Sequence, residues 1–253
     1  MNLKDKIALV TGSSRGIGKA IAFDLAKNGC RLIVHGSRDS EALSCSYDDV
    51  KKLSPASIKV VANLADSDAI SQMFKTVEKQ FGRIDVLVNN AATQNQSQFL
   101  DLKEEDWDFV MKVNLKAPFL CSQHAGRLMR ISGGGKIVNI SSVHAYDAKR
   151  KFAHYSSSKG GLEILTKSMA IELAEFNIQV NSLVVGAIAT EMTPADRCSK
   201  LLSAIPAHRI GQADEVARLV TFLSSNDCDY LTGASIKIDG GLTLGFCASR
   251  PDL

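Results

Sequence analysis

Short runs of apolar, β-branched residues alternate along the chain with longer stretches whose apolar residues recur at helical spacing. Uninterrupted apolar runs of this length are typical of strands that are buried on both faces of a parallel sheet. The pattern predicts seven strands, at 7–10, 31–35, 58–61, 84–89, 136–141, 178–184 and 235–238. Because helical stretches separate these strands, the predicted fold class is α/β, a doubly wound parallel sheet with helices on both faces.

The clearest helical periodicity follows the first predicted strand. Ile17, Ile21 and Leu25 repeat at helical spacing, and Gly29 supplies a stop. Further helices are expected over 67–81, within 104–131, over 155–176 and over 214–223. No Pro-, Gly- or Ser-rich linker divides the chain, so a single domain over residues 1–253 is expected.

Composition and charge narrow the classes of function. The chain is 45% hydrophobic and 23% charged, and its net charge of +3 is too small and scattered to indicate a nucleic-acid partner. No secretory leader and no apolar stretch of roughly 18 residues is present, so no membrane partner and a cytoplasmic location are expected. The six cysteines form no C-x-x-C pair, which favours free thiols and no metal site.

A glycine-rich turn, Thr11-Gly12-Ser13-Ser14-Arg15-Gly16-Ile17-Gly18, follows the first predicted strand directly. Glycines let backbone N–H groups approach a pyrophosphate at a helix N-terminus. The G-x3-G-x-G spacing is looser than G-x-G-x-x-G, so on spacing alone a purely structural turn explains it equally well. Its place between a strand and a helix favours a dinucleotide site.

The end of the second predicted strand bears on the choice of dinucleotide. A carboxylate there would accept hydrogen bonds from the adenosine ribose and favour NAD, but the sequence is His35-Gly36-Ser37-Arg38, with Asp39 as the first acid. Ser37 and Arg38, together with Arg15, could surround a 2′-phosphate instead. We therefore expect NADP(H), with NAD(H) as the alternative, and a solvated surface charge as the competing explanation for Arg38.

Tyr155 and Lys159 are four residues apart on a predicted helix and therefore share one face. A neighbouring ammonium favours the phenolate, which would make the tyrosine useful in proton transfer near neutral pH. Ser142 ends a predicted strand and Asn114 lies within a predicted helix. Each of these residues alone has a structural explanation, but together they point to a redox enzyme.

In combination these features resemble the classical short-chain dehydrogenase/reductase family, from Lys6 to about Leu244. The segments that carry the resemblance are Thr11 to Gly18, Asn89-Asn90-Ala91-Ala92, Asn114, Asn139-Ile140-Ser141-Ser142, Tyr155-Ser156-Ser157-Ser158-Lys159 and Ile238-Asp239-Gly240-Gly241. The resemblance implies a Rossmann-type fold and hydride transfer between a ketone and a secondary alcohol.

The resemblance also implies a role for each catalytic residue. Tyr155 would protonate the carbonyl oxygen, and Ser142 would donate a hydrogen bond to the same oxygen. Lys159 would hold the nicotinamide ribose and lower the pKa of Tyr155. Asn114 would hold a water that links Lys159 to solvent.

A set of cofactor-binding residues follows from the same resemblance. It comprises Gly12, Ser14, Arg15, Gly16, Ile17, Gly18, Ser37, Arg38, Asn63, Leu64, Asn90, Tyr155, Lys159, Gly186 and Ile188. The chain departs from the family pattern at Asn63, commonly an aspartate, at Ala92, usually a glycine, and at Val185, often a proline. None of these departures touches a proton-transfer residue, so an active enzyme is expected.

The substrate is less defined by the sequence. Residues 188–210 are predicted to form a substrate lid with an apolar face. The chain most resembles 3-oxoacyl-carrier-protein reductases, with sugar, polyol or steroid dehydrogenases as alternatives. Ile171 stands where the carrier-protein enzymes tend to have an arginine, which weakens docking to an acidic carrier. A small-molecule or acyl-thioester substrate is expected in either case.

Two further expectations concern the oligomeric state and an alternative class of function. The resemblance implies a homotetramer, which apolar faces within 104–131 and 155–176 would permit. A non-catalytic protein that senses dinucleotides is the alternative of another class, and it would predict a damaged catalytic set.

Overall fold

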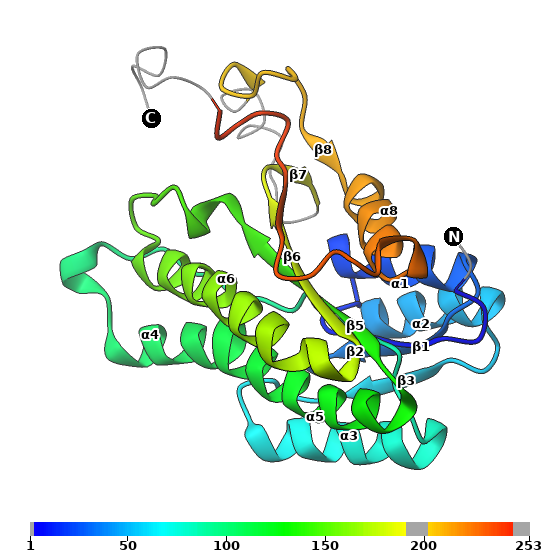
Figure 1. Cartoon of the computed structure of the whole chain (residues 1–253). Helices are drawn as coiled ribbons and strands as arrows, with labels where there is room; N and C mark the ends of the chain where they lie inside the picture. Colours follow the sequence, from blue (N-terminus) through cyan, green and yellow to red (C-terminus); the bar gives the residue numbers. More distant parts are fainter. Residues whose placement is uncertain (1–2, 191–201, 245–253) are drawn as a thin grey trace.

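A central sheet of seven parallel strands organises the computed structural model, which describes residues 3–190 and 202–244 (Figure 1). The strands are β1 (Ile7–Val10), β2 (Arg31–Gly36), β3 (Ile58–Val61), β4 (Val86–Asn89), β5 (Gly135–Ser142), β6 (Ile178–Val185) and β9 (Ser235–Ile238). Their spatial order is β3-β2-β1-β4-β5-β6-β9. The order reverses between β1 and β4, which creates the switch point where doubly wound folds bind ligands. The predicted seven-stranded sheet is confirmed.

Helices cover both faces of this sheet, as predicted. They are α1 (Gly16–Lys27), α2 (Glu41–Leu53), α3 (Ser67–Phe81), α4 (Glu104–Met111), α5 (Ala117–Ser132), α6 (Ala153–Leu173) and α8 (Ala213–Leu223). Apolar residues of α1, α2 and α8 form one core with the sheet, and those of α3, α5 and α6 form a second core on the opposite face (Figure 1).

Local sequence signals explain why α3 has the bounds that its periodicity predicts. The Asp66 side chain accepts hydrogen bonds from the backbone N–H groups of Asp68 and Ala69 and so caps the N-terminus. Gly82 ends the helix at φ +70°, a left-handed conformation that glycine adopts readily. Ile70 and Phe74 lie on the buried face between these signals.

One helix and one short pair of strands were not predicted. The helix α2 begins after Ser40, whose side chain accepts a hydrogen bond from the Leu43 backbone N–H. Its buried face includes Ser46 beside Leu43 and Val50, so the sequence shows no regular apolar period there. A short parallel pair joins β7 (Ile188–Ala189) to β8 (Gly211–Gln212). This pair bounds the predicted lid, whose residues 191–201 lie outside the described residues.

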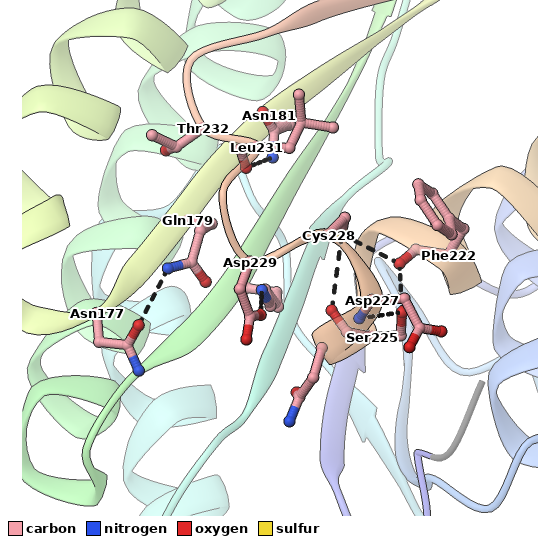
Figure 2. A network of polar contacts seen from close by, with 12 residues as sticks. Asn177, Gln179, Asn181, Phe222, Ser225, Asp227, Cys228, Asp229, Leu231 and Thr232 are labelled. Carbon is pink, nitrogen blue, oxygen red and sulfur yellow. Dashed lines mark hydrogen bonds and ion pairs between the residues drawn. The ribbon is translucent and has the colours of Figure 1, made fainter.

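The amino end of the sheet is fixed by a polar network in the loop between α8 and β9 (Figure 2). Asn181 Nδ2 donates to the backbone oxygen of Leu231 at 2.8 Å, and the Cys228 thiol lies 3.3 Å from the Phe222 oxygen. The buried ammonium of Lys136 pairs with Asp229 at 2.5 Å. This network holds the loop before β9 against β6 at the amino end of the sheet. The opposite, carboxyl edge of the sheet carries the candidate functional residues. No helix within the described ranges has both the length and the apolar character needed to span a bilayer.

Candidate active site

The carboxyl ends of the seven strands meet at one edge of the sheet, because all of them run parallel. The predicted site residues gather there for that reason. The glycine turn follows β1, Ser37 and Arg38 follow β2, Asn63 follows β3, Asn90 follows β4, Ser142 ends β5 and Gly186 follows β6. Ser142 pairs in register with Val185, which places the serine beside the turn at Gly186.

The N-terminus of α1 suits an anion. Arg15 is its N-cap residue and makes no side-chain cap hydrogen bond, and the first turn carries no acid. The backbone N–H groups of that turn therefore face no competing carboxylate within the helix. Gly16 adopts φ +55°, and a Cβ there would meet nothing closer than Thr190 at 3.6 Å. This open approach to the backbone fits the pyrophosphate of a dinucleotide.

Gly12 and Gly18 serve the protein's own packing. A Cβ at Gly12 would lie 2.9 Å from Ala91 Cα, and one at Gly18 would clash with the Gly12 oxygen and with Asn90. Asn90 Nδ2 donates to the backbone oxygens of Thr11 and Gly12 at 2.9 and 3.1 Å. Asn90 and Gly18 thus shape the turn, and direct contact of either residue with a cofactor stays a prediction.

His35 supports the same turn, a role that the sequence analysis missed. Its Nδ1 accepts from the Gly12 backbone N–H at 3.0 Å, so the ring proton sits on Nε2, 3.0 Å from the Ala62 oxygen. Burial lowers the pKa of His35 to about 4, which keeps the ring neutral at ordinary pH. The only sequence signal was its place at a strand end, two residues before Ser37.

The residues predicted to bind the adenosine half lie at the surface of this edge. Arg15, Ser37 and Arg38 are exposed, as is Asn63, whose Oδ1 already accepts from the Ala65 backbone N–H at 3.1 Å. Leu64 is buried.

The acid nearest to this surface is engaged elsewhere. Asp39 pairs with Lys59 at 2.9 Å, and this pairing lowers the pKa of Asp39. Its charge is therefore partly neutralised rather than directed at Arg38.

The predicted catalytic residues come together between β5 and α6. Ser142 is 7% exposed at the end of β5, and Lys159 is 3% exposed on the second turn of α6. Lys159 Nζ donates to the Ile140 oxygen at 2.8 Å and lies 5.8 Å from the centre of the Tyr155 ring. The Ser142 hydroxyl is near enough to Tyr155 to act on the pKa of the phenol. The arrangement provides a hydroxyl pair beside a buried ammonium.

Burial dominates the electrostatics of both titrating groups. It raises the pKa of Tyr155, and the Ser142 hydroxyl opposes this shift only in part. Burial also lowers the pKa of Lys159 to about 8, although the carboxylate of Glu163 favours the charged form. The protein's own groups therefore do not lower the phenol pKa as the sequence predicts, because desolvation of the phenolate outweighs the opposing effect of Ser142.

Asn114 is fully buried in a π-helical segment, Lys112–Lys116, between α4 and α5. Its Oδ1 accepts from the Thr93 backbone N–H at 2.8 Å, and its Nδ2 donates to the Thr93 oxygen at 2.9 Å and to Ser158 Oγ at 3.1 Å. These contacts use both amide protons and leave one Oδ1 lone pair for the predicted water. The visible role of the side chain is to join the loop after β4 to α6.

Aromatic side chains line Tyr155 on one side. The rings of His144 and Phe152 lie edge-on to it, with centres 6.3 and 6.0 Å away. Lys149 places its ammonium 5.1 Å from the centre of the Phe152 ring.

Glu163 was also missed by the sequence analysis. It is 3% exposed and lies one helical turn beyond Lys159, and its spacing of i+4 from that lysine was the only signal. Over the part of the chain that the structure describes, no cluster of three or more His, Cys, Asp or Glu could hold a metal ion.

Comparisons with known proteins agree with this geometry. A family model described as Enoyl-(Acyl carrier protein) reductase matches residues 12–243. The chain is 39% identical to a 3-oxoacyl-[acyl-carrier-protein] reductase of Synechocystis sp. over 243 residues. This aligned region covers 96% of this chain and 98% of that protein.

Solved structures show the same fold at similar identity. A short-chain dehydrogenase/reductase variant from Serratia marcescens matches with a TM-score of 0.91 and 33% identity, over 96% of this chain and 100% of the other. A candidate 2-deoxy-D-gluconate 3-dehydrogenase from Agrobacterium tumefaciens, with bound NADP, matches with a TM-score of 0.88 and 33% identity, over 96% and 98% of the two chains. Together with the ordered motifs at the carboxyl edge of the sheet, these matches establish that the chain belongs to the short-chain dehydrogenase/reductase family of oxidoreductases.

Proposed function

We propose that this chain is an NADP(H)-dependent reductase that interconverts a ketone and a secondary alcohol. The observation that carries the proposal is the convergence of Ser142, Tyr155 and Lys159 at the edge of the sheet where α1 presents its N-terminus. A bound nicotinamide would supply or accept the hydride.

The three side chains divide the proton chemistry among them. Ser142 donates a hydrogen bond to the carbonyl oxygen of the substrate, and Tyr155 gives that oxygen its proton. The raised pKa of Tyr155 keeps its hydroxyl protonated at neutral pH, which is the form that a proton donor needs. Lys159 would hold the nicotinamide ribose and partly stabilise the phenolate that remains.

Two observations support NADP(H) over NAD(H). Arg15 and Arg38 are exposed at the adenosine side of the site, where guanidinium groups can bind a phosphate through paired hydrogen bonds. Asp39, the nearest acid, is paired with Lys59. The similar structure from Agrobacterium tumefaciens contains NADP, which supports the same choice.

A 3-oxoacyl thioester, or a related ketone of a biosynthetic pathway, is the substrate class we favour. The 39% identity to a 3-oxoacyl-[acyl-carrier-protein] reductase supports the acyl group. Ile171 is 80% exposed and carries no charge for an acidic carrier, which favours a thioester that arrives without a carrier protein. A sugar, polyol or steroid ketone is the second candidate, because a structural relative is named for a gluconate derivative.

Oxidation of NADPH, followed by nicotinamide absorbance, tests the activity against a panel of acyl-CoA thioesters, sugars and steroid ketones. We expect turnover of at least one class, and a loss of about 100-fold or more in kcat for Tyr155→Phe. Tyr230→Phe is the matched control, because Tyr230 is fully exposed and should leave the rate unchanged. Equal rates in wild type and Tyr155→Phe would refute the proposal.

We also propose a homotetramer in the cytoplasm. An apolar groove between α4, α5 and α6 is lined by Met111, Leu115, Phe119, Ile164 and Leu165, and Ile164 is 62% exposed. A second copy of the chain would cover this surface. Light scattering should show a smaller assembly for Ile164→Glu, whereas Ile171→Glu, on the same helix outside the groove, should keep the wild-type mass. Free thiols at Cys30, Cys121 and Cys228 support the reducing compartment.

A further inference from the structure

Glu163 is a buried carboxylate at the centre of a hydrogen-bond cluster. Its Oε1 accepts from Ser182 Oγ on β6 at 2.8 Å. Its Oε2 accepts from Tyr146 in the loop after β5 at 2.8 Å, and from Ser235 on β9 at 2.5 Å. Three hydroxyl donors from three different elements thus converge on one side chain of α6.

These donors keep Glu163 ionised. Burial acts to raise the pKa of Glu163, but the surrounding hydroxyl groups, that of Ser235 first, outweigh it, and the pKa is lowered. A full negative charge therefore remains inside the protein, where charges interact more strongly than in water.

Lys159 is the cation that faces this charge on the same helix. The two residues are four apart, so their side chains are neighbours on one face of α6. Glu163 acts against the desolvation that lowers the pKa of Lys159. The other groups around Glu163 are the Tyr146 phenol and, beyond it, Lys237 on β9, whose Nζ lies 5.4 Å from the centre of the Tyr146 ring.

The same carboxylate also fixes the loop that follows Ser142. Tyr146 is 49% exposed, and its hydroxyl bond to Glu163 ties this loop to the buried face of α6. His144, two residues earlier, lies against Tyr155, so the tether reaches the wall of the active site.

We propose that Glu163 is a positioning residue of the active site, which acts through Lys159 by holding a negative charge beside it and through Tyr146 by anchoring the loop after Ser142. The inference rests on the proposed reductase function, in which Lys159 must be charged. Glu163 then helps to set the pH range over which the enzyme is active, in addition to its part in packing.

The pH dependence of kcat/KM for NADPH separates these roles. Glu163→Gln removes the charge and keeps a similar shape, so the alkaline limb of the profile should move to lower pH by about one unit. Tyr146→Phe and Glu163→Asp are the matched controls that retain the charge. Both should keep the alkaline limb where it is, even if kcat or the melting temperature falls.

The outcomes distinguish this inference from the function on which it rests. If wild type reduces ketones and Tyr155→Phe does not, the proposed function stands. An alkaline limb at the wild-type pH in Glu163→Gln would then overturn the role of Glu163 alone. Should Glu163→Gln not fold, Glu163→Met provides a second test, because it also removes the charge and keeps a side chain of similar length. An alkaline limb at the wild-type position in Glu163→Met would overturn the inference as well.

Discussion

The ammonium of Lys159 donates a 2.8 Å hydrogen bond to the backbone oxygen of Ile140, inside the contact between α6 and β5. This bond fixes the lysine beneath Tyr155 but does not replace the water that a charged amine loses on burial, and the pKa of Lys159 falls to about 8. The residue therefore changes charge within the range in which an enzyme can be assayed.

We predict that kcat/KM for NADPH decreases as pH rises through about 8, because Lys159 loses its proton there. Each further pH unit should cost about tenfold. Lys159→Arg keeps its charge throughout this range, so its residual activity should show no alkaline limb near pH 8. An alkaline limb near pH 8 in that variant would assign the titration to another group.

Arg38 is predicted to select the phosphorylated cofactor. Arg38→Asp replaces an exposed guanidinium with a carboxylate that repels a 2′-phosphate, so KM for NADPH should rise about tenfold to 100-fold, with a smaller change for NADH. Arg127→Asp is the control for the change in charge, since α5 lies on the opposite face of the sheet from α1. A ratio of the two KM values that stays at the wild-type level in Arg38→Asp would count against the phosphate site.

The sequence predicted the sheet, which the structure confirms, because its strands follow from local spacing. Seven apolar runs marked the strands. The four-residue separation of Tyr155 and Lys159 is also a local pattern, and the catalytic role proposed for these residues rests on it. The helix α2 escaped because its buried face includes Ser46 and so lacks an apolar period. Periodicity detects only elements that bury apolar side chains at regular intervals.

The supporting contacts of the site could not be predicted in the same way. His35 bonds to Gly12 across 23 residues of sequence, Asn114 to Thr93 across 21, and Glu163 to Ser235 across 72. No local pattern encodes such pairs, because the sheet topology alone brings them together. The direction of the Tyr155 pKa shift was missed for a related reason, since burial is a property of the whole fold.

Asn114 is expected to matter for activity through the segments that it joins. Asn114→Ala leaves the Thr93 backbone groups without their partner, which should lower the free energy of unfolding by about 1–3 kcal/mol. It also frees Ser158, next to Lys159, so kcat should fall about tenfold.

A second buried asparagine provides the matched control. Asn181 holds the backbone of Leu231 and Ala234, and these hydrogen bonds reach neither Thr93 nor Ser158. Asn181→Ala should cost similar stability in urea unfolding and leave kcat of the folded fraction unchanged. Equal losses of kcat in the two variants would reduce Asn114 to a structural residue.

His35 is predicted to make the protein sensitive to acid. Its pKa is about 4 in the folded chain and 6.5 in the unfolded chain, so the unfolded chain binds more protons between these values. The stability that the neutral ring contributes is present above pH 6.5 and is lost as pH falls toward 4, by about 3 kcal/mol over the interval.

Urea unfolding at several pH values measures this contribution. His35→Asn keeps an acceptor for the Gly12 N–H but does not titrate, so its stability should decline less steeply than that of wild type below pH 6.5. The comparison of the two proteins removes the contributions of His124, His144 and His154, whose pKa values burial also lowers. Parallel curves for the two proteins would exclude His35 as the acid-sensitive group.

The glycine turn allows a test of which glycine serves the cofactor and which serves the fold. Gly16 adopts φ +55° with open space before it, so Gly16→Ala should fold at a cost of about 1 kcal/mol in backbone strain. The new methyl group would project from the anion-binding turn, and KM for NADPH should rise. Gly18→Ala would clash with the Gly12 backbone oxygen, which cannot move without displacing β1.

The two variants should therefore separate stability from cofactor affinity. Gly18→Ala should lose about 3 kcal/mol or more in urea unfolding, because the clash lies between backbone atoms rather than with a flexible side chain. Binding of NADPH, measured by calorimetry on the folded protein, should weaken in Gly16→Ala even though its stability is close to that of wild type. If Gly16→Ala bound NADPH as tightly as wild type, the backbone of the α1 N-terminus would not be the surface that the pyrophosphate contacts, and the site would have to lie elsewhere along the carboxyl edge of the sheet.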